Sequence, residues 1–67
     1  MDTERFSCGL DDSGQVWWLN GDEGTNLRVD KIVDRDEFGY VRTVRVGGRY
    51  FSRDEHDPIG MYREVEP

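Results

Sequence analysis

The chain has no alanine, one cysteine and one histidine among its 67 residues. Nucleophilic and acid–base sites need a reactive side chain, a base and a group that orients them. Cys8 and His56 lie far apart in the sequence, and acidic residues flank His56. One cysteine forms no internal disulfide, and a lone cysteine is typical of a reducing compartment, where it serves as a small buried hydrophobe. We therefore expect a cytoplasmic protein that is not an enzyme and has no catalytic residue, metal site or cofactor.

Long apolar runs and an excess of basic charge are also missing. No apolar run approaches the roughly 20 residues that a membrane helix needs, and residues 1–5 lack the basic and apolar regions of a signal peptide. Fifteen acidic and nine basic side chains give a net charge of −6. This charge works against a general attraction to nucleic acid or anionic lipid. We expect no membrane partner, and direct nucleic-acid binding is the less favoured interaction.

The residues that are present favour strands. Eight glycines are scattered along the chain, and β-branched and aromatic residues dominate the apolar set. Period-2 patterns predict strands at residues 6–10, 15–19, 27–33, 40–46, 49–53 and 61–65. The pattern of 27–33 breaks in its second half, which predicts a bulge near Asp30 or Lys31. A proline-containing polar segment permits at most one short helical turn near residues 54–58.

These elements predict a mostly β fold, a small antiparallel β-barrel or strongly bent sheet of five or six strands, in a single domain over residues 1–67. The arrangement resembles SH3-like barrels in outline, and no motif of that family matches residue by residue.

Gly47 and Gly48 separate two strand-like runs and predict a two-residue hairpin with a type I′ turn, in which both glycines take positive φ. This turn pairs Val44 with Phe51 on one face of the hairpin. Val41 then lies on the opposite face, because side chains alternate along a strand.

An acidic segment at residues 34–39 has carboxylates at alternate positions, as at the start of a calcium-binding loop. The fifth position is Phe38 and the twelfth is Arg45, where such a loop needs oxygen ligands. We therefore interpret this segment as a turn.

Trp17 and Trp18 point to opposite faces of their strand. Either both pack in a two-faced barrel wall, or Trp17 is exposed with neighbouring tyrosines as a protein-binding hot spot. The candidate protein-binding residues are Trp17, Tyr50, Asp11, Asp12, Asp22 and Glu23.

Charge is unevenly distributed along the chain. Residues 1–26 carry six acids and one base, residues 27–53 seven bases and four acids, and residues 54–67 five acids and one base. The candidate nucleic-acid-binding residues are Arg42, Arg45, Arg49 and Arg53. With Tyr50 they form a possible platform for phosphates and bases, whereas the alternative interpretation is internal charge balance between strands.

Size, charge and the lack of reactive groups predict an acidic, non-enzymatic protein-interaction module that docks on a basic protein surface. A regulatory or inhibitor protein, encoded by a phage or mobile element and mimicking nucleic-acid phosphates, is a sharper form of this hypothesis. One alternative is a nucleic-acid-binding barrel that uses the hairpin at residues 40–53. Another is a self-associating structural protein whose aromatic surface pairs with itself.

Overall fold

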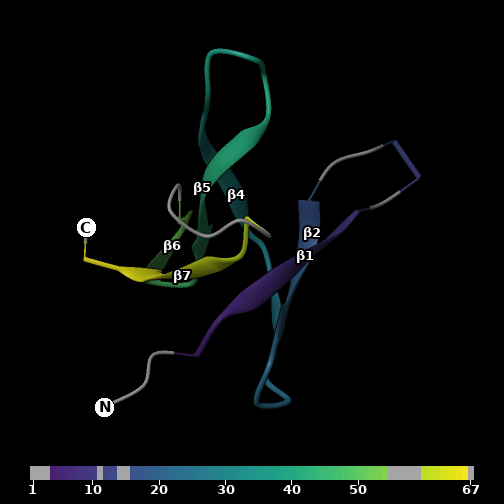
Figure 1. Cartoon of the computed structure of the whole chain (residues 1–67), viewed down its shortest axis with the longest axis vertical. Helices are drawn as coiled ribbons and strands as arrows, with labels where there is room; N and C mark the ends of the chain where they lie inside the picture. The colour runs from purple at the N-terminus through teal and green to yellow at the C-terminus, as the bar shows by residue number, and fades with distance from the viewer. Residues whose placement is uncertain (1–3, 11, 14–15, 55–59, 67) are drawn as a thin grey trace.

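The chain folds as one strongly curled antiparallel sheet that forms a half-barrel (Figure 1). The computed structural model describes residues 4–10, 12–13, 16–54 and 60–66, without the side chains of Val16 and Trp17, and these residues contain no helix. The seven strands are β1 (Phe6–Leu10), β2 (Val16–Gly21), β3 (Asn26–Arg28), β4 (Lys31–Arg35), β5 (Val41–Val46), β6 (Arg49–Arg53) and β7 (Tyr62–Val65). Their order in the sheet is β3-β2-β1-β7-β6-β5-β4. The predicted mostly β, bent-sheet fold is confirmed, with seven strands rather than five or six. Most of the predicted helical turn near residues 54–58 lies outside the described residues.

The additional strand arises where one long strand was predicted over residues 27–33. β3 ends at Arg28 and β4 begins at Lys31, and the two strands lie at opposite ends of the sheet order. Val29, between them, is buried, and the backbone N–H of Asp30 donates to a carbonyl of β5. The predicted bulge near Asp30 or Lys31 is therefore wrong in position, because a corner lies there and the register shift of β4 falls later, between Ile32 and Asp34. Since this short link joins both ends of the sheet, the sheet has to curl back on itself.

The β5–β6 hairpin has the predicted register, with Val44 opposite Phe51. Its turn differs from the prediction, because Gly47 has a φ of 61° and Gly48 has no positive φ. Positive φ at the first central residue alone is the pattern of a type II′ turn rather than type I′. Both turns match the twist of the strands, so the register is the same for either.

Val41 and Val44 are both buried, although they lie three residues apart on β5. The prediction that they occupy opposite faces is wrong. β5 pairs with β4 through two register shifts, one of which sets Arg35 opposite Val41 directly after Asp34 opposite Thr43. This extra residue on β5 is a β-bulge, which reverses the alternation and turns Val41 inward.

A small core fills the inside of the curl. Its buried residues are Phe6, Leu19, Val29, Val41, Val44, Phe51 and Tyr62. The rings of Phe6 and Phe51 meet edge to face, with centroids 5.2 Å apart. This contact matters because β1 and β7 pair only through Phe6 and Tyr62. The sheet is thus held together at this seam by side-chain packing more than by its hydrogen-bond ladder.

Beyond the Phe6–Tyr62 pair, β1 no longer pairs with β7. Cys8 is exposed, and Leu10 is 62% exposed. The prediction that Cys8 is a small buried hydrophobe is therefore wrong. The alternating pattern of β1 identifies the strand correctly, but only Phe6 at its start reaches the core.

Candidate protein-binding surfaces

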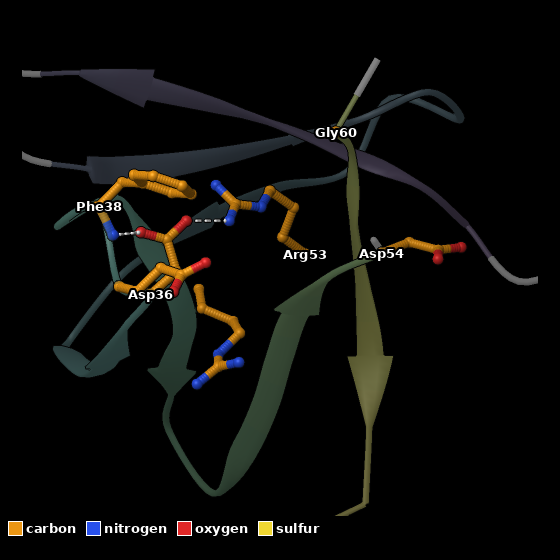
Figure 2. Close-up of a pocket in the computed structure, with 7 residues that line it drawn as sticks. Asp36, Phe38, Arg53, Asp54 and Gly60 are labelled. Atoms are coloured by element: carbon orange, nitrogen blue, oxygen red, sulfur yellow. Dashed lines mark hydrogen bonds and ion pairs between the residues drawn. The ribbon is translucent and has the colours of Figure 1, made fainter. Parts of the chain in front are cut away.

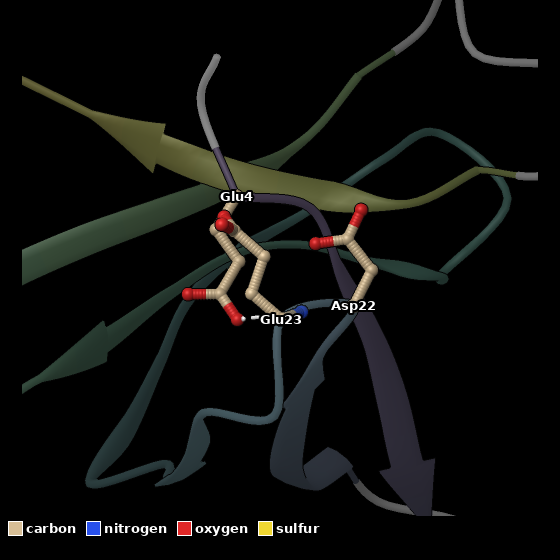
Figure 3. A group of neighbouring side chains, drawn as sticks. All are labelled: Glu4, Asp22 and Glu23. Carbon is tan, nitrogen blue, oxygen red and sulfur yellow. Dashed lines mark hydrogen bonds between the residues drawn. The ribbon is translucent and has the colours of Figure 1, made fainter. Parts of the chain in front are cut away.

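Three carboxylates from two separate segments meet at one end of the β1–β2 pair (Figure 3). Glu4 precedes β1, while Asp22 and Glu23 follow β2; we call these three residues the acidic corner. One oxygen from each lies within 4.8 Å of the others. The antiparallel pairing of Phe6 with Gly21 brings the two segments together. Asp22 and Glu23 are predicted site residues, whereas Glu4 is not.

Backbone contacts fix the acidic corner. The Glu4 Oε2 atom accepts hydrogen bonds from the N–H groups of Glu23, at 3.1 Å, and Thr25, at 3.3 Å. Asp22 Oδ1 accepts from the N–H of Arg5 at 3.3 Å. A Cβ atom at Gly21 would overlap the Glu4 carboxylate, so glycine at that position makes room for it. The carboxylates of Glu4 and Asp22 therefore stand in a defined arrangement.

Within the described residues, none of these three carboxylates has an ion-pair partner within 4.0 Å. Glu4 is close enough to Arg49 for its charge to help raise the pKa of that arginine, whose ion-pair partner is Glu64. Clustered carboxylate oxygens suit hard cations and the charged hydrogen bonds of lysine and arginine. Exposed acidic groups are common without a bound ion. The chemistry that the acidic corner offers is the binding of a cationic group.

Three of the four candidate arginines form ion pairs with acids of the same chain. The pairs are Arg42 Nε–Asp34 at 3.2 Å, Arg49–Glu64 with two contacts of 2.9 Å, and Arg53–Asp36 at 2.6 Å. The guanidinium of Arg49 also lies 5.1 Å from the centre of the Phe51 ring. These contacts favour internal charge balance as the reason for the arginine-rich hairpin. The hypothesis that the hairpin binds nucleic acid through all four arginines stays a prediction.

A depression of about 590 Å³ lies beside the β4–β5 turn (Figure 2). Asp36 anchors its wall, because Oδ1 accepts from the N–H groups of Phe38 and Tyr40, each at 2.9 Å, while Oδ2 pairs with Arg53. The hydrogen bond from Arg53 lowers the pKa of Asp36, and burial partly opposes this. Phe38 is 75% exposed at the turn. Asp36 thus stabilises the turn. The predicted turn is confirmed for residues 36–39, whereas Asp34 and Arg35, which were predicted to belong to it, are the last residues of β4.

Tyr50 lies on the outer face of the C-terminal strands, opposite the side where Val44 and Phe51 are buried. It lines a groove of about 490 Å³. The groove is lined by Val33, Thr43, Tyr50, Ser52, Val65 and Glu66. The hydroxyls of Thr43 and Ser52 lie 3.2 Å apart and are hydrogen-bonded to each other. This surface combines apolar and hydroxyl side chains with the carboxylate of Glu66, and it is separate from the acidic corner in the strand order.

Trp18 lies on the outer face of β2 and is 47% exposed, whereas Leu19 is buried. Gly9 on β1 and Arg28 on β3 flank Trp18 in the register. A Cβ atom at Gly9 would lie 3.3 Å from the Trp18 Cβ, so glycine at this position avoids a tight contact with Trp18. The side chain of Trp17 lies outside the described part of the chain, and its role in binding stays a prediction.

The remaining candidates do not join the acidic corner. Asp12 is exposed in the turn between β1 and β2, whereas Asp22 follows the opposite end of β2. A strand of this length spans about 20 Å, so the two acids lie at different ends of the molecule. Asp11 is outside the described residues. Sequence reasoning missed Glu4 because its position depends on strand pairing rather than on any local pattern.

Comparisons with protein-family models, curated proteins and solved structures find no match for this chain. Within the described residues, no helix is long and apolar enough to cross a membrane. A function is therefore inferred from the surfaces themselves.

Proposed function

We propose that the chain is a non-catalytic protein-interaction module that docks its acidic corner on a basic surface of another protein. The observation that carries the proposal is the contrast in charge pairing. Three arginines of the hairpin are engaged by Asp34, Asp36 and Glu64. The carboxylates of the acidic corner have no such partner within the described residues, and they contribute to a net charge of −6.

The fixed geometry of the acidic corner adds support. Glu4 is held by two backbone N–H groups, so its carboxylate is already oriented before a partner arrives. Binding then costs less side-chain entropy than it does for freely rotating acids. Complementary charge also speeds encounter and discriminates between partners. A regulatory or inhibitor protein that covers a basic site, including a site for nucleic acid, would use such a surface.

The experiment compares three forms of the chain as bait in affinity capture from cell extract. The corner variant E4Q/D22N/E23Q removes three charges but keeps acceptor oxygens for the backbone contacts. The control variant D12N/E37Q/E66Q removes the same number of charges at other exposed positions. A protein that binds the wild type and the control variant, fails to bind the corner variant, and dissociates as salt is raised supports the proposal.

The two variants carry equal net charge, so the comparison isolates the position of the charges. The proposal is wrong if no captured protein distinguishes the corner variant from the control variant. It is also wrong if capture by the wild type is indifferent to salt.

A further inference from the structure

Two cations stand side by side on the outer face of the C-terminal strands. Lys31 on β4 lies directly opposite Arg45 on β5 in the register. Like charges directly opposite each other destabilise a strand pair. Neither residue has an ion-pair partner within the described part of the chain, although the other three arginines of the hairpin do.

Arg45 has a second unusual property. Its Nε atom is buried and has no hydrogen-bond acceptor. A buried donor without an acceptor costs about 1–3 kcal/mol. An anionic group held between Lys31 and Arg45 would remove the repulsion between the two cations, and its attraction to both charges would compensate for part of that cost.

The same face continues into the groove described above. One register row runs Lys31, Arg45, Tyr50, Val65 across β4, β5, β6 and β7. Three steps between neighbouring strands cover about 14 Å. Cations thus stand at one end of the row, with an aromatic and an aliphatic side chain at the other. The groove beside Tyr50 and Val65 is open to solvent and has a volume of about 490 Å³.

We propose that this row, Lys31–Arg45–Tyr50–Val65, binds an acidic, extended peptide segment of a partner protein. A carboxylate of the segment lies between Lys31 and Arg45, and an apolar side chain two or more residues away enters the groove beside Tyr50 and Val65. A segment of about four to five extended residues spans the row. This site is independent of the acidic corner, so the failure of either proposal leaves the other in place.

The limited charge of the row favours a peptide over nucleic acid. A nucleic acid carries a phosphate at every residue and needs many cations along its path. The described outer row offers two, on a chain whose net charge is −6. One or two carboxylates beside apolar side chains match the row in both charge and polarity.

The test uses fluorescence anisotropy with a labelled peptide of alternating glutamate and leucine. A second peptide has glutamine in place of glutamate, and a labelled oligothymidylate represents nucleic acid. Arg45→Gln removes the proposed contact. Arg28→Gln removes one exposed cation from β3, outside the row, and serves as the matched control.

The acidic peptide is expected to bind the wild type and to lose about tenfold in affinity with Arg45→Gln, the size of one charge-assisted hydrogen bond. Arg28→Gln should change the affinity by less than about twofold. The glutamine peptide should bind at least about tenfold more weakly than the acidic one. Amide chemical-shift changes of the isotope-labelled wild type should centre on the row, which supports the site without any substitution.

Four results would overturn the proposal. The first is no binding of the acidic peptide at about 1 mM. The second is an equal loss in both arginine variants, which would reflect general charge attraction. The third is equal binding of the two peptides. The fourth is tighter binding of oligothymidylate than of the acidic peptide, which would assign the row to nucleic acid.

Discussion

The hydroxyl of Tyr62 on β7 donates a hydrogen bond to the backbone carbonyl of Val41 on β5. These strands are not neighbours, since β6 lies between them. The bond therefore crosses the inside of the curled sheet, next to the bulge that turns Val41 inward. Burial raises the pKa of Tyr62 to about 12, so the hydroxyl stays a donor at all physiological pH values.

Replacing Tyr62 with phenylalanine tests the importance of this bond. The change keeps the ring but leaves the Val41 carbonyl without its donor, so the free energy of unfolding should fall by about 1–3 kcal/mol. Urea denaturation measures the difference. Tyr40→Phe is the control, since Tyr40 is 66% exposed and should show almost no effect. Equal effects of the two substitutions would show that the internal bond contributes nothing.

The turn of the β5–β6 hairpin gives a second prediction. Gly47 has a φ of 61°, and Gly48 has no positive φ. Gly47→Ala should therefore destabilise the protein by about 1–2 kcal/mol, because a side chain disfavours this conformation. Gly48→Ala should stay within about 0.5 kcal/mol, since a Cβ there meets nothing within 4 Å. A type I′ turn would make both substitutions costly, and that result in thermal or urea unfolding would contradict the assignment.

Acid sensitivity should trace to two ion pairs. The hydrogen bond from Arg53 lowers the pKa of Asp36, and the hydrogen bond from Arg49 lowers the pKa of Glu64. Because both folded-state pKa values lie below the unfolded ones, the stabilisation is full above the unfolded pKa values of about 4. It is lost as the pH falls through the folded-state values. Unfolding curves from neutral to acidic pH should therefore show a decline confined to the acid limb.

The matched variants for this prediction are Arg53→Gln and Arg49→Gln. Each should return the pKa of its own partner toward the ordinary value and leave the other carboxyl unchanged. Carboxyl chemical shifts followed by NMR titration report the two sites separately. If Asp36 titrates at the same pH with and without Arg53, the ion pair is not the cause of its lowered pKa.

The acidic corner depends on a glycine. A Cβ at Gly21 would overlap the Glu4 carboxylate and lie 3.0 Å from a ring carbon of Phe6. Gly21→Ala should push Glu4 away from the N–H groups of Glu23 and Thr25, at a cost of about 1–2 kcal/mol for those bonds. In the variant that also carries Glu4→Ala, the two changes should cost less than their sum. Strictly additive unfolding free energies would show that Gly21 and Glu4 do not interact.

The sequence predicts most of the fold through local patterns. Alternation identifies the strands, and Gly47–Gly48 defines the best hairpin, with the correct register between Val44 and Phe51. The corner at Val29 and Asp30 escapes such reasoning. A break in the alternation of apolar and polar residues has the same appearance in the sequence whether it marks a bulge within one strand or a corner between two strands. Tertiary packing decides which of the two forms.

The candidate surfaces are less predictable for the same reason. Asp22 and Glu23 are apparent in the sequence as an acidic loop, whereas Glu4 joins them only through the pairing of β1 with β2. The arginines of the hairpin form a basic run in the sequence, but Asp36 and Glu64 approach two of them from other strands or turns. Exposure of Cys8 likewise depends on how far β7 extends along β1.

The central claim is that the acidic corner is the docking surface for a basic protein. Its most direct test is the affinity of a labelled peptide of alternating arginine and glycine for the wild type, the corner variant E4Q/D22N/E23Q and the control variant D12N/E37Q/E66Q, at one salt concentration. The account predicts at least about a tenfold loss for the corner variant and less than about threefold for the control variant. Equal losses in the two variants would contradict it, because they would show that only the net charge of the chain matters.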